Sequence, residues 1–229
     1  VAVVEQVPRL RQRLDLDFVV VNGENAAGGF GITPKIAEEF YDSGIDCLTT
    51  GNHVWDQREL LGSIDRDKRM VRPANFPAGT PGRGATLLQA RGGRQVLVVN
   101  IMARLFMDAL DDPFAAVDRL LADMAMPGVV DAIIVDFHGE ASSEKMAMGH
   151  HLDGRVTLVV GTHTHIPTAD LHILRGGTAY QTDAGMCGDY DSVIGMVKEP
   201  AVARFIRKMP TERLTPAEGQ PTICGLVLE

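Results

Sequence analysis

The sequence predicts an α/β protein in which helices flank either one mixed β-sheet or mixed β-sheets arranged as a two-sheet sandwich. Strand-like and helix-like segments alternate through the first two thirds of the chain, which indicates a largely parallel sheet covered by helices. Several later strand candidates have no helix between them, which indicates antiparallel pairing. The 229 residues, 45% of them hydrophobic, suffice for one substantial core, and no linker or repeat divides them. We therefore expect a single domain over residues 1–229.

Each expected element follows from the local pattern of residues. Short apolar runs, many of them rich in β-branched residues, predict strands at 17–22, 45–50, 85–90, 94–101, 129–137, 155–160, 169–175, 178–183 and 222–229. Segments with helical patterning predict helices at 1–14, 34–44, 54–64, 114–126, 143–152 and 200–209. Thr33 and Pro34 suit the start of the second helix, and Gly44 suits its end. Residues 72–84 are rich in proline and glycine and predict a loop.

The composition restricts the class of protein. A net charge of −8 argues against nucleic-acid binding through a broad basic surface, but it allows a small phosphate ester held by metal ions. No apolar run reaches the roughly 20 residues that span a bilayer, so we expect no membrane segment. The three cysteines form no CxxC pair and no export signal is visible. A cytoplasmic location is therefore expected.

Residues that can bind metals follow four of the expected strands. They are Glu24 and Asn25, then Asn52 and His53, then His138, and finally His163 and His165. Ligands bind outside the carboxyl ends of the strands in open α/β sheets, so four such loops would meet there. Three histidines, one carboxylate and two asparagine carbonyls suit Fe, Mn, Zn or Ni better than Mg or Ca. In extended backbone, His163 and His165 would project to the same side and ligate two neighbouring metals, or one metal twice.

Structural interpretations compete with this one. A loop histidine can simply form hydrogen bonds, and Glu24 and Asn25 are of types common in turns and caps. The glycine-rich loop around them is a weak signal for an anion, and it lacks the Gly-Lys-Ser/Thr ending of a Walker A loop. Asp136 can orient an imidazole or point away from it. Arg72 and Asn75 lie in a loop that could touch a phosphate, although a structural turn is the preferred interpretation. Three further acids are interpreted as caps of loops: Asp183, Asp189 and Asp191.

Longer motifs carry a family resemblance that covers essentially the whole chain. They are VNGENAAGGFGITPKIA, TTGNHVWD, RPANFPAGTPGRG, VDFHGEASSEK, VVGTHTHIPTAD and DAGMCGDYDSVIGM. The GNH segment and the His-x-His segment resemble motif blocks of the calcineurin-like metallophosphoesterases. The longer strings are similar to the YmdB-like bacterial phosphodiesterases, which act on cyclic nucleotides, including 2′,3′-cyclic ones. The resemblance implies the calcineurin-like metallophosphoesterase fold.

The same resemblance implies a dinuclear centre and a reaction. The centre would hold two divalent or trivalent metal ions, with iron as the first expectation and manganese and zinc as alternatives. The implied ligands are Glu24 as the bridge, Asn25 and His165 on one metal, and Asn52, His138 and His163 on the other. His53 would donate a proton to the leaving oxygen. The hypothesis is that metal-activated hydroxide hydrolyses a small-molecule phosphodiester, a 2′,3′-cyclic nucleotide, with 3′,5′-cyclic nucleotides as a further substrate to test.

The chain departs from the family at its beginning. Family members start with a strand ending in Gly-Asp, whose Asp ligates the first metal, and no such motif precedes Val1. We expect this strand to lie upstream of Val1, because its loss would leave the backbone groups of a neighbouring strand unpaired. One alternative is a regulatory protein with a vestigial metal site that acts by binding a partner, and another is a phosphomonoesterase or nuclease. Some family members are oligomers, so a homo-oligomer stays open.

Overall fold

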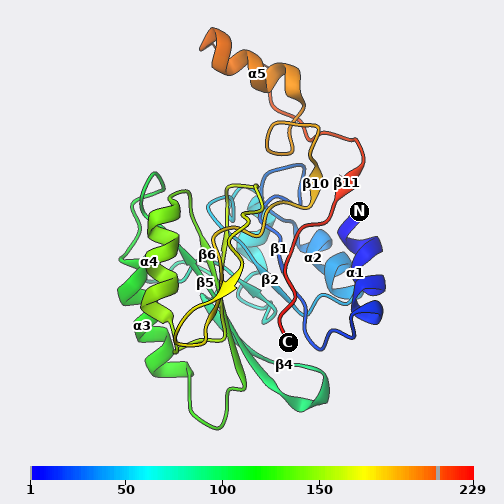
Figure 1. The fold of residues 1–229 in the computed structure, drawn as a ribbon. Coiled ribbons are helices and arrows are strands. Elements are labelled where there is room, and N and C mark those ends of the chain that lie inside the picture. The colour runs from blue at the N-terminus through cyan, green and yellow to red at the C-terminus, as the bar shows by residue number, and fades with distance from the viewer. Residues whose placement is uncertain (1, 210–211) are drawn as a thin grey trace.

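The computed structural model describes residues 2–209 and 212–229, and Val1, in the predicted first helix, lies outside the described residues. Two β-sheets face each other between two layers of helices. Figure 1 shows α1 and α2, in blue, on the side of the smaller sheet, and α3 and α4, in green, on the side of the larger one. This arrangement confirms the predicted fold class of mixed sheets flanked by helices.

The smaller sheet has three parallel strands in the order β1-β2-β3. The bounds in this part of the chain are α1 Ala2–Arg13, β1 Val20–Asn22, α2 Pro34–Asp42, β2 Cys47–Thr49, the 3-10 helix η1 Arg58–Gly62, and β3 Met70–Val71. The Thr33 hydroxyl caps α2 by accepting the N–H of Ile36, as the sequence predicted. The predicted helix at 54–64 is wrong in part, because only η1 winds there.

The larger sheet has six strands in the order β4-β5-β6-β7-β9-β8. The bounds here are β4 Ala85–Gln89, η2 Arg91–Gly93, β5 Gln95–Met102, α3 Pro113–Met124, β6 Ala132–His138, α4 Ser142–Leu152, β7 Leu158–Thr162, β8 His172–Ile173 and β9 Ala179–Gln181. The strands β5, β6, β7 and β9 are parallel, whereas β4 and β8 pair antiparallel at the two edges. Because most strands within each sheet are parallel, their carboxyl ends lie at the same edge of that sheet.

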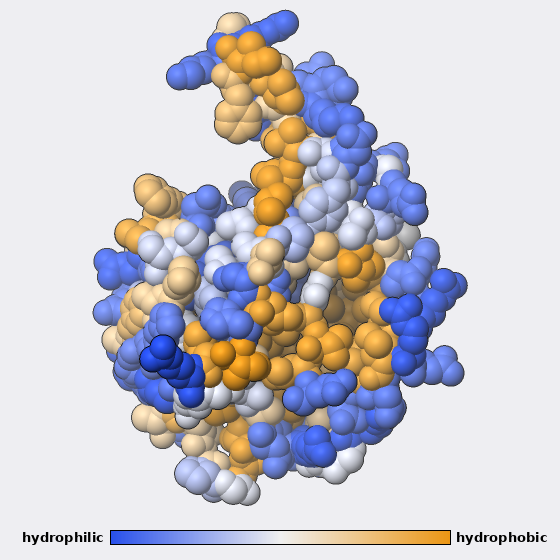
Figure 2. All heavy atoms as spheres, in the orientation of Figure 1, coloured by the Kyte–Doolittle hydropathy of each residue, from blue (hydrophilic) through white to orange (hydrophobic). Residues whose placement is uncertain are grey.

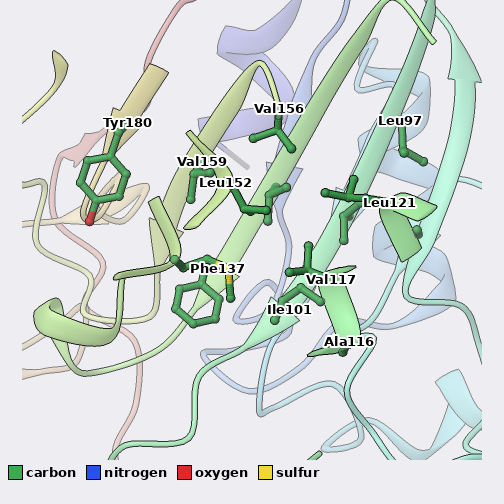
Figure 3. Close-up of a cluster of buried hydrophobic side chains, with 14 of the residues drawn as sticks. Leu97, Ile101, Ala116, Val117, Leu121, Phe137, Leu152, Val156, Val159 and Tyr180 are labelled. Carbon is green, nitrogen blue, oxygen red and sulfur yellow. The ribbon is translucent and has the colours of Figure 1, made fainter. Parts of the chain in front are cut away.

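Apolar side chains fill the space on both sides of the larger sheet. Between the sheets, Cys47 and Val71 pack with Val96 and Val98. On the outer face, a larger cluster joins the sheet to α3 and α4, and Figure 3 draws its side chains. In that cluster Phe137 is fully buried. A third cluster lies between the smaller sheet and its helices, so the apolar interior of the described residues consists of three layers, of which the middle one joins the two sheets.

The C-terminal region adds a short hairpin and a projecting helix. The bounds are β10 Gly188–Asp189, α5 Lys198–Arg207 and β11 Pro221–Thr222, and β10 pairs antiparallel with β11. Figures 1 and 2 show α5 standing away from the body of the molecule, with apolar residues gathered along it. Phe205 and Ile206 are both 77% exposed. Within the described part of the chain, every helix is too short or too polar to cross a membrane.

Candidate metal centre

Four loops from both sheets meet at the carboxyl ends of the strands. Strand β1 leads to Glu24 and Asn25, β2 to Asn52 and His53, β6 ends at His138, and β7 leads to His163 and His165. The two sheets are joined just below these loops, where the Asn22 amide donates a 3.1 Å hydrogen bond to Asp136. The candidate site thus lies at the edge where ligands bind in α/β sheets.

The Nε2 atom of His138 lies at the centre of the first group of side chains. It is 3.0 Å from Glu24 Oε1, 2.9 Å from Asn52 Oδ1 and 3.2 Å from His163 Nδ1. Glu24 and His138 are buried, and the imidazoles of His138 and His163 meet edge to face. Ligand atoms of Glu24, His138 and His163 all lie within 4.8 Å of one another, close enough for one metal ion to contact all three.

A second group lies beside the first and contains Asn25 and His165. The Asn25 Nδ2 atom is 3.1 Å from His165 Nε2. Among the described residues, the buried Oδ1 atom of Asn25 has no hydrogen-bond partner. His165 Nδ1 is 2.9 Å from the carbonyl oxygen of Ile194, which favours the proton on Nδ1 and leaves Nε2 as a possible ligand. An unpaired buried amide oxygen next to an imidazole nitrogen that can act as a ligand suits a cation.

Gly51 keeps the centre of the first group open. A Cβ atom at this position would lie 2.3 Å from His138 Nε2 and 2.4 Å from Glu24 Oε1, far inside normal contact. Any side chain on residue 51 would therefore occupy the space between the two ligand atoms. The glycine of the GNH segment is explained by this space, since its φ is not one that requires glycine.

The charge states of two ligands favour metal binding at neutral pH. Burial raises the pKa of Glu24, but the charge and hydrogen bond of His138 and the backbone N–H of His53 outweigh it and lower the pKa to about 2. Burial and the neighbouring charge of His138 lower the pKa of His163 to about 4. Glu24 is thus ionised and His163 neutral near pH 7, and these are the forms that coordinate metals.

A chain of hydrogen bonds fixes which nitrogen of His138 is free. The Thr162 hydroxyl donates to Asp136 Oδ1 at 2.6 Å, so it accepts from His138 Nδ1, which is 2.9 Å away. With Nδ1 held in this way, Nε2 is the nitrogen of His138 that faces the site and is available to a metal. Asp136 also accepts hydrogen bonds from Thr49 and Asn22. Burial raises the pKa of Asp136, and these donors oppose that effect.

His53 lies at the rim of the site. Its Nδ1 atom is 2.8 Å from Asp56 Oδ2, and its ring packs edge to face against Phe30. Its backbone N–H donates to Glu24 Oε1 at 3.0 Å, which ties this loop to the first group of ligands. The side chain is 34% exposed. His53 is therefore placed beside the ligands and within reach of solvent.

The backbone of the THTH segment differs from the extended conformation that the sequence suggested. His163 and His165 have φ values of +103° and +66°, where residues other than glycine are uncommon. Their imidazoles consequently reach different partners, His163 toward His138 and His165 toward Asn25. Each such conformation costs roughly 1–3 kcal/mol and persists only where the surroundings impose it.

Several residues outside the predicted ligand set help to build the site. Thr162 and Gly51 adjoin predicted ligands, so they could have been suspected, whereas nothing in the sequence signals the contacts of Asn22. Glu140 Oε2 lies 3.2 Å from His163 Nε2, opposite the nitrogen that faces His138. Arg72 and Asn75, in contrast, bond mainly to backbone carbonyls of their own loop and of neighbouring segments, which agrees with a structural role.

The site opens into a groove beside β1. The groove has a volume of about 1120 Å³, and its lining includes Glu24, His163 and His165. Apolar residues of both sheets, among them Val21 and Ile134, line the remainder. The groove therefore adjoins part of the candidate ligand set.

Comparison with known proteins identifies the family. The model of the YmdB-like protein family matches residues 1–229. The 2′,3′-cyclic-nucleotide 2′-phosphodiesterase of Bacillus subtilis is 48% identical over 225 residues, covering 98% of this chain and 84% of the relative. A putative phosphatase/phosphodiesterase of Mycoplasma pneumoniae is 35% identical over 204 residues, covering 86% of this chain and 71% of the relative.

Solved structures agree with this result. A hypothetical protein from Thermus thermophilus superposes with a TM-score of 0.87 at 42% identity, covering 98% of this chain and 91% of that one. A novel phosphatase from Mycoplasma pneumoniae superposes with a TM-score of 0.88 at 31% identity, covering 96% and 79%. The expected metallophosphoesterase fold is confirmed by this likeness. The chain belongs to the YmdB-like protein family.

Proposed function

We propose that this protein is a metal-dependent phosphoric diester hydrolase that opens 2′,3′-cyclic nucleotides. The observation that carries the proposal is the convergence on His138 Nε2 of ligand atoms from Glu24, Asn52 and His163. The activity named for the Bacillus subtilis relative supplies the substrate class. We also propose that the described residues act as one metallophosphoesterase domain, because the two sheets share a core.

The residues present fit two cations. Glu24, Asn52, His138 and His163 would hold one, and Asn25 and His165 would contribute to the other, with Glu24 shared between them. Three observations support the fit: the unpaired Oδ1 of Asn25, the space kept by Gly51, and the lowered pKa values of Glu24 and His163. The mixed nitrogen and oxygen donors suit iron, with manganese and zinc as alternatives.

Bound cations would supply Lewis acidity, which activates water and offsets negative charge on phosphate oxygens. The side chains of the protein would position the cations and supply the proton that the leaving oxygen needs. In the reaction a water oxygen bonds to phosphorus, the bond from phosphorus to O2′ breaks, and O2′ takes a proton. His53 would give that proton as the imidazolium, with its Nδ1–H donated to Asp56 and its Nε2–H available to the leaving oxygen.

The test is hydrolysis of 2′,3′-cyclic AMP by protein loaded in turn with iron, manganese and zinc. We expect metal-dependent formation of 3′-AMP, separated from 2′-AMP by chromatography, and slower turnover of 3′,5′-cyclic AMP and nitrophenyl phosphate. Elemental analysis of the same samples gives the number and identity of the metals. Protein that carries metal but leaves every diester intact would contradict the proposal. Protein that binds no metal and hydrolyses nothing would favour the vestigial-site alternative.

A further inference from the structure

Behind the THTH segment lies a buried ion pair that the proposed reaction does not use. Lys145, on α4, places its Nζ atom 2.7 Å from Asp183 Oδ2, which follows β9. Both side chains are only 1% exposed. Burial of two charges is unfavourable unless additional hydrogen bonds satisfy them. The groups that form those hydrogen bonds therefore indicate what the ion pair holds in place.

Those additional bonds go to the backbone on either side of His163. Lys145 Nζ donates to the carbonyl oxygen of Thr162 at 2.7 Å. Asp183 Oδ2 accepts the N–H of Thr164 at 3.0 Å. The peptide groups that precede and follow His163 are therefore both held by one ion pair. Asp183 Oδ1 also accepts the N–H of Gly185 at 2.9 Å, which anchors the carboxylate itself.

Fixing both peptide groups restricts the two backbone angles of His163. Its φ of +103° is one that residues other than glycine rarely adopt, so the surroundings must impose it. His165, two residues on, has a φ of +66°. The hydrogen bonds from Lys145 and Asp183 lie on both sides of His163, where they can hold its backbone in this conformation.

The fold makes room for this arrangement. A Cβ atom on Gly161 would lie 1.7 Å from the carbonyl oxygen of Thr182 and 3.0 Å from Cδ of Lys145. Only glycine at this position lets the lysine stem and the segment before Asp183 pack against the end of β7. Ala184 N–H also donates to the Gly161 carbonyl oxygen at 2.9 Å, which continues the contact.

We propose that Lys145 and Asp183 are positioning residues that hold the His163–His165 segment in the conformation that presents its imidazoles to the metal site. The assignment rests on the metal site of the proposed function. It differs from a purely stabilising role, in which the ion pair would contribute to folding but leave the geometry of the imidazoles unaffected.

The experiment compares Lys145→Met with the double variant Lys145→Met/Asp183→Asn. The double variant leaves no uncompensated charge in the core, so it serves if the single variant does not fold. Thr178→Val is the matched control. Thr178 is fully buried and its hydroxyl bonds to Gly154 and Val156, at the opposite end of the sheet.

Two quantities are measured at a temperature at which all variants are folded. The first is the affinity for Mn²⁺ by calorimetric titration, and the second is hydrogen exchange of the Thr164 amide in chelator-treated protein. We expect Mn²⁺ affinity to fall about 10- to 100-fold in both Lys145 variants, as for loss of groups that orient metal ligands. Exchange at Thr164 should accelerate at least tenfold, whereas Thr178→Val should lower Tm and change neither quantity.

Unchanged affinity and exchange in the Lys145 variants would overturn the assignment. The assignment would also be overturned if Thr178→Val lowered Tm as much as the Lys145 variants and lost as much Mn²⁺ affinity. The loss of affinity would then follow from lower stability alone. If the unaltered protein binds no Mn²⁺, iron or zinc, the proposed function fails. Exchange at Thr164, which needs no metal, then still decides whether the ion pair fixes the segment.

Discussion

His138 Nε2 lies 3.0 Å from Glu24 Oε1, although His138 ends a strand of the larger sheet and Glu24 follows a strand of the smaller one. In metal-free protein the charge and hydrogen bond of His138 lower the pKa of Glu24, so a proton lies between the two atoms, and a bound metal ion would replace it. Two such atoms at this separation repel each other unless a proton or a cation lies between them. The packing of the two sheets at this point therefore creates a position for a cation as well as stabilising the fold.

The first prediction concerns the central imidazole. His138→Ala should remove at least one of two bound metal equivalents, because three further ligand atoms are arranged around Nε2 of this residue. Metal content is measured by elemental analysis after loading and desalting. His151→Ala is the control, since His151 bonds to Asp118 on the helical side of the sheet. Full metal content in His138→Ala would remove this residue from the ligand set.

A methyl group at residue 51 should act on the same centre without removing any ligand. In Gly51→Ala the Cβ atom would approach within 2.4 Å of both His138 and Glu24. We expect metal affinity to fall at least tenfold and stability to fall by about 1–3 kcal/mol, as for an overpacked core. Gly62→Ala is the matched control, because no heavy atom of the described residues lies within 4 Å of its Cβ position. Equal affinities in the two variants would contradict the role given to Gly51.

His53 should affect turnover but not metal content. If it supplies the proton to O2′, His53→Ala should lower kcat by about 10²–10⁴-fold. Asp56→Asn should give a smaller loss, because it weakens the orientation of the imidazole without removing it. The measurements are steady-state kinetics with 2′,3′-cyclic AMP and elemental analysis of each variant. Unchanged turnover in metal-loaded His53→Ala would exclude this residue as the proton donor.

The position of the site could be predicted from the sequence, whereas its internal geometry could not. Ligand-capable residues directly follow apolar strands, and the carboxyl ends of those strands meet in space, so the convergence of Glu24 with His138 was foreseeable. The bond from Asn22 to Asp136 was not, because it depends on how two sheets pack. The positive φ of His163 was likewise hidden, since it is imposed by Lys145 and Asp183 from other elements.

The hydrogen-bond chain behind His138 gives a further prediction. In Thr162→Val the hydroxyl that accepts from His138 Nδ1 and donates to Asp136 is lost, while the shape of the side chain is kept. Metal affinity should fall about 10- to 100-fold, as for other losses of groups that orient a metal-binding histidine. Thr162→Ser retains the hydroxyl and should recover most of the affinity. Failure of the serine variant to recover it would mean that packing, not the hydrogen bond, is responsible.

The lowered pKa of Glu24 predicts a pH dependence of stability in metal-free protein. The folded state holds this pKa at about 2, below the ordinary value of 4.5, so folding favours the ionised carboxylate. The resulting stabilisation is complete above about pH 4.5 and is lost as the pH falls toward 2, an effect on the order of 3 kcal/mol.

Glu24→Gln carries no ionisable group at this position and should lack that part of the pH dependence. Urea unfolding of both proteins, in the presence of a chelator, gives the free energy of unfolding between pH 6 and pH 3. The difference between the two proteins should shrink as the pH falls, because protonation of Glu24 cancels its advantage over glutamine. A constant difference over this range would mean that Glu24 is not held ionised by His138 and the backbone N–H of His53.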